Sequence, residues 1–461
     1  MNWILFFIFA ALAVGMILPA FRRKDYRLQF PCLAGLTVLM QVALPMASLT
    51  GRSGELSDGA MTRFSVMAIL CLIAAWTGYQ WWKPQRRMWL PQFDDRRLAI
   101  SALILVAFGG FFTLRLGAIT PDIDPVTTNW TGIATVYDFF ASVMRYGAVL
   151  AVILFFRTKD WKLLLLSLPQ LWEYLVLFKN GRRSPTGEVI VVICVLMFFY
   201  RKWTVPLWAM VLGIFAMAVF CFNIGTIRAT KDQPLSERIH AIAEANPLRA
   251  VTLEGMADDR NYVEIYNGAN FMDSKAKGGH YTLGLHFWNA LVFSYVPAQF
   301  LGRDFKQGLM INLTDDTTQT GFQKSNGTCE TGIGEAFMAF GYFGCVLFFG
   351  LGAFMRWLWE GAVRNSILHQ LMFMLCALGS VLAFNIQLWT FINAVLNITL
   401  FAGPLLWWSH SQQRQQSARP VSSNMGGIAA PPSHRRTILS PIRSRTRLVF
   451  SAIHRRPRRQ F

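Results

Sequence analysis

Apolar residues in this chain are gathered into long blocks, and short polar segments separate one block from the next. The blocks are roughly 20 residues long, which is the length that an α-helix needs to cross a bilayer. They lack the two-residue alternation of membrane β-strands, and backbone in lipid is stable only as a helix or a closed barrel. We therefore predict an all-α fold, a polytopic helical bundle of about 11 transmembrane helices. The predicted spans are 3–21, 28–50, 63–82, 98–117, 136–156, 163–178, 189–200, 205–223, 335–357, 367–384 and 388–408.

The spans divide the chain into four regions. Residues 1–223 hold transmembrane helices 1–8, including an arginine-bearing hairpin at 179–188. Residues 224–333 contain the longest hydrophilic interval, which we predict to be a large loop on the outer face. Residues 334–409 hold transmembrane helices 9–11, and a basic tail at 410–461 follows.

One stretch of the large loop is long and apolar enough to be mistaken for a further span. Residues 281–301 are largely apolar but contain His286, Asn289 and Pro297. A crossing here would place every later basic cluster on the opposite side of the membrane, against the positive-inside rule. We therefore predict that 281–301 is an interfacial or re-entrant helix.

The basic clusters determine the predicted orientation. Arg22, Arg23 and Lys24 directly follow the first span, and another basic cluster follows the third span at 83–97. Lys and Arg collect on the cytoplasmic side of membrane proteins. The sequence therefore predicts an N-terminus on the outer side and a C-terminus in the cytoplasm.

The formal net charge of +19 could suggest a nucleic-acid partner, but its distribution argues against one. From His410 to the end there are 11 Arg and no Asp or Glu. This tail also carries Ser, Gln, Pro and Gly and little that could form a core, so we predict that it is disordered. We expect it to act as a topology signal and to attract anionic lipid, with no nucleic-acid partner.

Two arginines break this charge pattern. Arg182 and Arg183 fall on the predicted outer side, in the turn of the 179–188 hairpin. One explanation is an interfacial turn whose long side chains reach the polar headgroups. The other is an anion site, because guanidinium groups bind phosphate in a bidentate manner. The sequence leaves both explanations open.

A distinctive pattern lies where the large loop enters the ninth predicted span. It reads Gly334-Glu335-Ala-Phe-Met-Ala-Phe340-Gly341-Tyr-Phe-Gly344. A glycine and a glutamate followed by small and aromatic residues, at the entry to a span after a large outer loop, resemble the O-antigen polymerases of bacteria. These are the Wzy-type oligosaccharide repeat-unit polymerases.

Two more segments are similar to that family. They are the hairpin turn Gly181-Arg182-Arg183-Ser184 and the loop segment Val296-Pro297-Ala-Gln-Phe-Leu-Gly-Arg303-Asp-Phe-Lys306. The loop segment departs from the family pattern at two positions, because Ala298 stands in place of an arginine and Gln307 in place of a proline. The anion-binding role in this segment would then fall to Arg303.

The resemblance implies an enzyme of the bacterial inner membrane with one large periplasmic loop and, by analogy, a GT-C-like glycosyltransferase architecture. Such a polymerase transfers a growing glycan from undecaprenyl diphosphate to a hydroxyl of another lipid-linked repeat unit. The implied partners are undecaprenyl-diphosphate-linked oligosaccharides and membrane lipids, with a chain-length regulator and a flippase of the same pathway. No cofactor is expected, and arginine rather than a metal ion would stabilise the leaving diphosphate.

The implied reaction needs positive charge for the diphosphate and a group that accepts the proton of the acceptor hydroxyl. The predicted diphosphate- and glycan-binding residues are Arg182, Arg183, Arg303 and Lys306. The predicted catalytic residues are Glu335, His286 and His280, with Glu188 as a further carboxylate.

Two of these candidates also have a purely structural explanation. We place Glu335 in the first turn of its helix, where the macrodipole stabilises an anion and weakens it as a base. His286 lies on an otherwise apolar face, where a histidine is more often hydrogen-bonded than catalytic, although its ordinary pKa suits proton transfer.

Two other functions remain as alternatives. An O-antigen ligase would join the finished glycan to another acceptor with a similar architecture, and a transporter would carry out no chemistry. A transporter is expected to show internal repeats and ionisable groups at mid-membrane. We see no repeat, place Arg115 and Arg145 near span ends or within a turn or two of the outer face, and find Glu173 as the main interior acid. An enzyme is therefore favoured.

Overall fold

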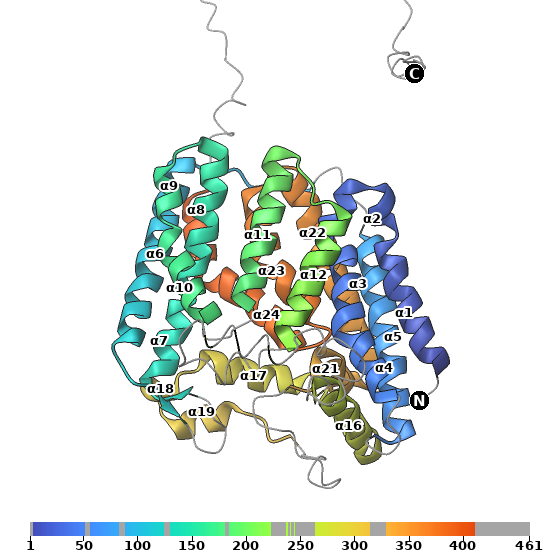
Figure 1. Ribbon diagram of the computed structural model, residues 1–461. Helices are drawn as coiled ribbons and strands as arrows, with labels where there is room; N and C mark the ends of the chain where they lie inside the picture. Colours follow the sequence, from blue (N-terminus) through green and yellow to red (C-terminus); the bar gives the residue numbers. More distant parts are fainter. Residues whose placement is uncertain are drawn as a thin grey trace, which may run out of the picture. The chain divides into compact units, whose positions relative to one another are not determined.

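The part of the chain that the structure describes is almost entirely helical (Figure 1). The computed structural model describes residues 3–50, 56–82, 88–123, 130–179, 184–222, 237, 240, 244, 263–313 and 329–410. Besides helices, these residues form one antiparallel ladder of two-residue strands, β1 (Asp122–Ile123) and β2 (Trp130–Thr131). All of them belong to the compact unit Met1–Gln412.

Seven helical segments among the described residues are long and apolar enough to cross a membrane, with 20 to 33 residues each. They are Trp3–Arg22, Phe30–Leu49, Asp58–Trp81, Asp95–Gly117, Ile133–Thr158, Thr331–Val363 and Leu388–Trp408. Their α-helices are α1 (Trp3–Ile17), α2 (Pro19–Arg22), α3 (Phe30–Val38), α4 (Leu44–Thr50), α5 (Asp58–Trp81), α6 (Asp95–Gly117), α7 (Ile133–Ala141), α8 (Met144–Thr158), α21 (Thr331–Phe340), α22 (Cys345–Val363), α24 (Leu388–Asn397) and α25 (Gly403–Trp408). The protein is thus a polytopic helical membrane protein.

The other four predicted spans also coincide with helices. These are α10 (Leu168–Lys179), which follows the single turn α9 (Lys162–Leu165), α11 (Ser184–Arg201), α12 (Leu207–Phe222) and α23 (Ile367–Leu382). They have 12, 18, 16 and 16 residues, so each is shorter than the roughly 20 residues of a full crossing. The prediction that all eleven segments cross the membrane therefore stays a prediction.

Two of the spans contain a π-helical turn. The 3₁₀ turn η1 (Lys24–Leu28) leads into α3, and the π segment η2 (Leu39–Ala43) then joins α3 to α4. A second π segment, η5 (Ile398–Ala402), joins α24 to α25. Such wide turns are rare inside α-helices and often lie near functional sites.

The glycines at the start of the ninth span make a sharp bend. The 3₁₀ turn η4 (Gly341–Gly344) separates α21 from α22, and Gly341 has a φ of +61°. A Cβ at Gly344 would lie 1.8 Å from the carbonyl oxygen of Ala336, so only glycine fits this bend.

The packed centre of the bundle is the contact between α5 and α22. Here the two backbones approach closely, because a Cβ at Gly78 would lie 2.1 Å from the Phe349 oxygen. Likewise, a Cβ at Gly352 would lie 2.0 Å from the Ala75 oxygen. Membrane helices commonly gain contact area through small residues of this kind.

One end of the bundle carries the basic clusters, and we call it the basic end. Arg157, at the end of α8, pairs with Asp95 at the start of α6, with 3.1 Å between Nε and Oδ1. The amide of Asp94 donates to the carbonyl of Ser409 at 3.0 Å, which places the end of α25 beside the start of α6. Helix ends that the charge pattern assigns to one side therefore do lie together.

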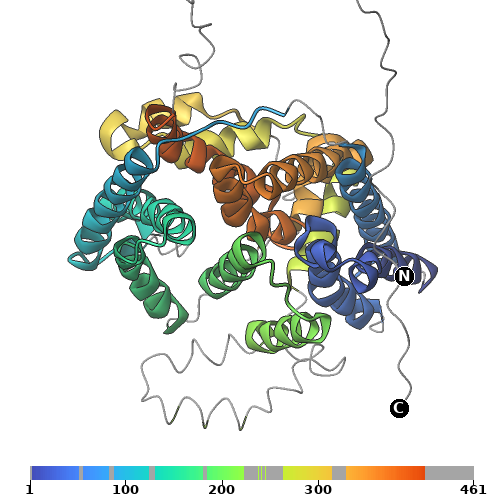
Figure 2. The same ribbon diagram turned by 90° about the horizontal axis from the view of Figure 1, so that it is seen from above.

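The opposite end, which we call the loop end, is covered by short helices. They are α16 (Val263–Gly278), α17 (Leu285–Tyr295), α18 (Ala298–Leu301) and α19 (Arg303–Leu309). Figures 1 and 2 show α17 and α19 lying across the end of the bundle rather than along it. With 11 residues, α17 is about 16 Å long and cannot cross a bilayer. The prediction that 281–301 is an interfacial or re-entrant helix stays a prediction.

The helices of the loop end are bonded to the bundle beneath them. Gln299 Nε2 donates to the carbonyl of Gly132 at 2.7 Å, and Tyr295 Oη donates toward Asn397 Oδ1 at 2.8 Å. Of the predicted loop 224–333, the structure describes 237, 240, 244, 263–313 and 329–333. The predicted tail 410–461 lies outside the described residues apart from His410.

Candidate functional site

Glu335 is buried, with 6% of its surface exposed, and it serves as a helix cap. Its Oε2 accepts the backbone N–H of Trp389 at 3.1 Å, in the first turn of α24. The prediction that Glu335 lies in the first turn of its own helix is wrong, because α21 begins earlier, at Thr331. A carboxylate that holds a helix N-terminus in this way is stabilised as an anion.

His286, at the start of α17, has one bonded and one unbonded ring nitrogen. Its Nδ1 lies 2.7 Å from Thr282 Oγ1, and that hydroxyl also donates to the Met338 carbonyl at 3.3 Å. Since the hydroxyl has one proton, this arrangement assigns the imidazole proton to Nδ1 and leaves Nε2 as a lone pair. Nε2 is buried and has no hydrogen-bond partner among the described residues.

The His286 ring is kept neutral by its surroundings. Burial and, to a smaller extent, the positive charge of Lys275 lower the pKa of its imidazole from 6.5 to about 4. At neutral pH the ring is therefore uncharged and able to accept a proton. A pKa this far below pH 7 makes the ring a weak base, but its buried Nε2 carries a lone pair that no hydrogen bond engages within the described residues.

The remaining described candidates lie on the exposed surface of the loop end. His280 is exposed, and its Nδ1 is 2.5 Å from the carbonyl oxygen of Gly278. Arg303 is exposed at the start of α19. Lys306 Nζ donates to the Phe293 carbonyl at 2.8 Å and lies 4.6 Å over the Phe293 ring, and partial burial lowers its pKa. The structure gives no direct bond between any of these residues and Glu335 or His286 within the described ranges.

Arg182 and Arg183 lie outside the described residues. The helices that flank them are described, since α10 ends at Lys179 and α11 begins at Ser184. The site predicted for these arginines therefore falls on the residues between α10 and α11 in the sequence.

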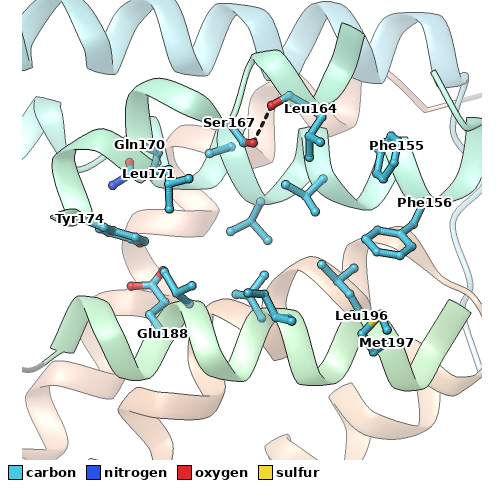
Figure 3. Close-up of a pocket in the computed structure, with 16 residues that line it drawn as sticks. Phe155, Phe156, Leu164, Ser167, Gln170, Leu171, Tyr174, Glu188, Leu196 and Met197 are labelled. Carbon is cyan, nitrogen blue, oxygen red and sulfur yellow. Dashed lines mark hydrogen bonds between the residues drawn. The ribbon is translucent and has the colours of Figure 1, made fainter. Parts of the chain in front are cut away.

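An apolar groove runs between α8, α10 and α11 (Figure 3). Its volume is about 380 Å³. The lining is Ala148, Val149, Val152, Phe155, Phe156, Leu164, Ser167, Gln170, Leu171, Tyr174, Glu188, Val189, Val192, Ile193, Leu196 and Met197. Leu171 and Ile193 are about half exposed, so the groove opens on the surface of the bundle.

The two ends of the groove differ in polarity. Figure 3 shows Gln170, Tyr174 and Glu188 together at one end, away from the aromatic rings at the other. Glu188 and Tyr174 lie near the start of α11 and toward the end of α10, so this polar end faces the loop end of the bundle. Glu188 is 9% exposed and Gln170 5% exposed.

Arg145 completes this polar group from α8. It lies one helical turn before Ala148 and Val149, on the same side of the helix, toward the loop end. Its Nη2 donates to Tyr146 Oη at 3.1 Å. Arg145 is the thirteenth of the 26 residues of the candidate span Ile133–Thr158, and its predicted position within a turn or two of the outer face stays a prediction.

The sequence did contain a signal for this group. Charged side chains inside apolar helices are costly and are usually functional, which applies to Arg145. What the sequence could not show is that Glu188 lines this groove and that Arg145, on a separate helix, lies close enough to Glu188 for their charges to interact.

The chemistry of the groove suits a molecule with a hydrocarbon part and an anionic head. The lining can accommodate the hydrocarbon part. Arg145 is not part of the lining, but it supplies a cation beside Glu188 at the polar end. Within the described ranges, no three His, Cys, Asp or Glu side chains gather into a group that could hold a metal ion.

Comparison of the chain with family models, with curated proteins and with solved structures found no match.

Proposed function

We propose that this protein polymerises oligosaccharide repeat units that are linked to undecaprenyl diphosphate, at the outer face of a bacterial inner membrane. The observation that carries the proposal is the apolar groove between α8, α10 and α11, which ends in a buried polar group on the loop side. A lipid-linked sugar needs this combination, since its hydrocarbon part stays at membrane level while its glycan stays in water. The turn with Arg182 and Arg183 joins two of the groove helices.

The proposed reaction is a displacement at the anomeric carbon of the donor glycan. An acceptor hydroxyl oxygen attacks this carbon, the bond from carbon to phosphate oxygen breaks, and undecaprenyl diphosphate leaves. Arg182, Arg183 and Arg145 stabilise the charge on the diphosphate, which replaces the role of a metal ion.

His286 accepts the proton of the acceptor hydroxyl in this proposal. Its Nε2 carries a lone pair and its ring is neutral at pH 7. Glu335 is less suited, because its carboxylate is engaged as the cap of α24. Arg303 and Lys306, on the exposed α19, are left to contact the glycan.

The proposed orientation follows from the charge pattern. The basic end, with Arg157 and Arg364, faces the cytoplasm, and the loop end faces the periplasm. The N-terminus is then periplasmic and the C-terminus cytoplasmic. All eleven helical segments cross the membrane in this topology.

A deletion strain of the native host tests the function. The strain is complemented with the wild-type protein, Arg182→Ala, Arg183→Ala or His286→Ala, and the length of its surface or secreted glycan is compared on a gel. A polymerase predicts single repeat units in the deletion strain and in variants that are expressed at normal levels. Glycan of unchanged length in the deletion strain would overturn the proposal. Long but unattached glycan would instead indicate a ligase.

A further inference from the structure

Several buried polar atoms without good hydrogen bonds gather at the loop side of the groove. In the described part of the chain, Arg145 Nε, Gln170 Oε1, Tyr174 Oη and Glu188 Oε1 are all buried and none makes a hydrogen bond of good geometry, although Tyr174 and Glu188 interact with each other. Buried polar atoms in folded proteins are nearly always bonded, so a cluster of exceptions calls for a ligand or an ion. The cluster contains one cation, one anion and two neutral groups.

Arg145 and Glu188 are close enough for their charges to interact, but no ion pair joins them among the described residues. A buried arginine is stable only with an anion near it. Glu188 supplies that anion from the facing helix α11, while Nε of Arg145 remains available. The arrangement is therefore a buried cation near an anion with which it forms no ion pair within the described residues.

We propose that Arg145 binds the phosphate of an isoprenoid phosphate lipid whose hydrocarbon chain lies in the groove, and that Glu188 is its counter-ion when the groove is empty. This inference rests on the proposed function, since it names residues that hold the lipid of the donor. On binding, the guanidinium donates hydrogen bonds to phosphate oxygens in place of its weaker attraction to Glu188. Tyr174 Oη is a second donor toward the same phosphate.

The shape and lining of the groove favour a branched hydrocarbon chain. The lining is Val, Leu, Ile and Phe along α8 and α11, with the two rings of Phe155 and Phe156 at the end far from Arg145. The opening beside Leu171 and Ile193 lets a lipid enter sideways from the membrane. A free phosphate would use only the polar end, and a bulk phospholipid shares the same head chemistry, so the experiment has to separate these sources.

The test measures lipid binding to the purified full-length protein in detergent, with undecaprenyl diphosphate as the probe. Phosphatidylglycerol and inorganic pyrophosphate are used as competitors. The variants are Arg145→Gln, Arg145→Lys and Glu188→Gln. Arg157→Gln is the matched control, because it removes an arginine from the basic end of the same helix and breaks only the pair with Asp95.

The expected result is that Arg145→Gln weakens binding by about tenfold or more, and that Arg145→Lys falls between it and the wild type. Glu188→Gln binds as tightly as the wild type or tighter, because a competing anion is removed. Arg157→Gln binds like the wild type. Unchanged binding by Arg145→Gln, or weaker binding by Glu188→Gln, would overturn the assignment of these two residues.

The competitors test the class of ligand. Competition by phosphatidylglycerol as strong as by the probe itself would overturn the isoprenoid assignment, and equal competition by pyrophosphate would overturn the placement of the chain in the groove. If Arg145→Gln does not fold, the double variant Arg145→Gln/Glu188→Gln removes both buried charges and serves in its place. We expect this double variant to fold and to bind undecaprenyl diphosphate about tenfold or more weakly than the wild type.

The binding assay and the glycan gel can reject the phosphate site and the polymerase function separately. If Arg145→Gln binds the lipid more weakly and the deletion strain still makes full-length glycan, the phosphate site is kept and the polymerase function is rejected. Shortened glycan in the deletion strain with unchanged binding by Arg145→Gln would keep the polymerase function and reject this site.

Discussion

Two groups of buried polar side chains contain the same four residue types, Arg, Glu, Tyr and Gln, but they are hydrogen-bonded to different extents. Near the basic end, Tyr79 Oη donates to Gln29 Oε1 at 2.8 Å, and Arg356 pairs with Glu360 at 2.5 Å. The Arg356 guanidinium also lies 5.2 Å over the Tyr79 ring, and only its Nε lacks a partner among the described residues.

The second group lies at the groove, and one buried atom of each member makes no hydrogen bond of good geometry within the described residues. Its members are Arg145, Gln170, Tyr174 and Glu188. The first group is held between α3, α5 and α22, whose backbones touch, whereas the second borders a groove of about 380 Å³. The same residue types are therefore hydrogen-bonded to one another in the first group and largely unbonded in the second. This is the expected difference between a structural network and a binding site.

The largest expected effect is on the closely packed half of the molecule. Gly352→Ala would put a Cβ 2.0 Å from the Ala75 carbonyl oxygen, which forces α5 and α22 apart. We expect loss of folded protein, measured as the monodisperse yield after size exclusion in detergent. Gly350→Ala, on the same helix, is the control, because its Cβ would meet no atom within 4 Å. Equal yields from the two variants would show that this packing is not decisive.

The next effect tests whether the groove is a site or merely loose packing. Ala148→Phe would place a ring in the groove, and we expect undecaprenyl diphosphate binding to fall by about tenfold or more while the melting temperature stays the same or rises. Ile104→Phe adds a ring at an exposed position of α6 and should change neither quantity. A large fall in melting temperature without a fall in affinity would mean that the groove does not hold the ligand.

A matched pair of tyrosine variants compares the two groups directly. Tyr79→Phe removes a hydrogen bond to Gln29 and should lower the free energy of unfolding by about 1 kcal/mol. Tyr174→Phe removes only a contact with Glu188 that falls short of hydrogen-bond geometry, so the change should stay within about 0.5 kcal/mol. Both are measured by denaturation in the same detergent. The distinction between the groups fails if Tyr174→Phe proves as costly as Tyr79→Phe.

The smallest effect concerns His286, which is half bonded and so stands between the two groups. Its folded pKa of about 4 lies below the unfolded value of 6.5, so the unfolded chain takes up the proton first as pH falls. The contribution to stability is complete above pH 6.5, is lost progressively as the pH falls toward 4, and changes no further below that. Between pH 7 and pH 5, the melting temperature should therefore drop less in His286→Gln than in the wild type.

The positions of the helices could be predicted from the sequence because a bilayer demands long apolar blocks. All eleven predicted segments coincide with helices, and the loop-side placement of His286 and Arg303 followed from the same pattern. The start of α21 could not be predicted, since polar residues such as Thr331 and Glu330 hide it within the loop. Glu335 was therefore expected in the first turn of α21, whereas its carboxylate accepts an N–H in the first turn of α24.

The groove could not be predicted, because it depends on contacts between separate helices. Arg145 and Glu188 each follow from the sequence as a charge within an apolar block, but only packing brings α8 and α11 together around one space. Whether a buried polar group is hydrogen-bonded likewise depends on how the helices pack, which the sequence alone does not show. The equal composition of the two polar groups shows this most directly.

The two π-helical turns, η2 and η5, have a consequence for how this bundle can change in length. A π-turn holds about one residue more than an α-turn. Losing one residue there could restore a regular helix with the flanking side chains still directed at the same neighbours. A deletion elsewhere in either span would rotate every following side chain by about 100°. Leu39–Ala43 and Ile398–Ala402 are therefore the places where related sequences could gain or lose a residue without repacking the bundle.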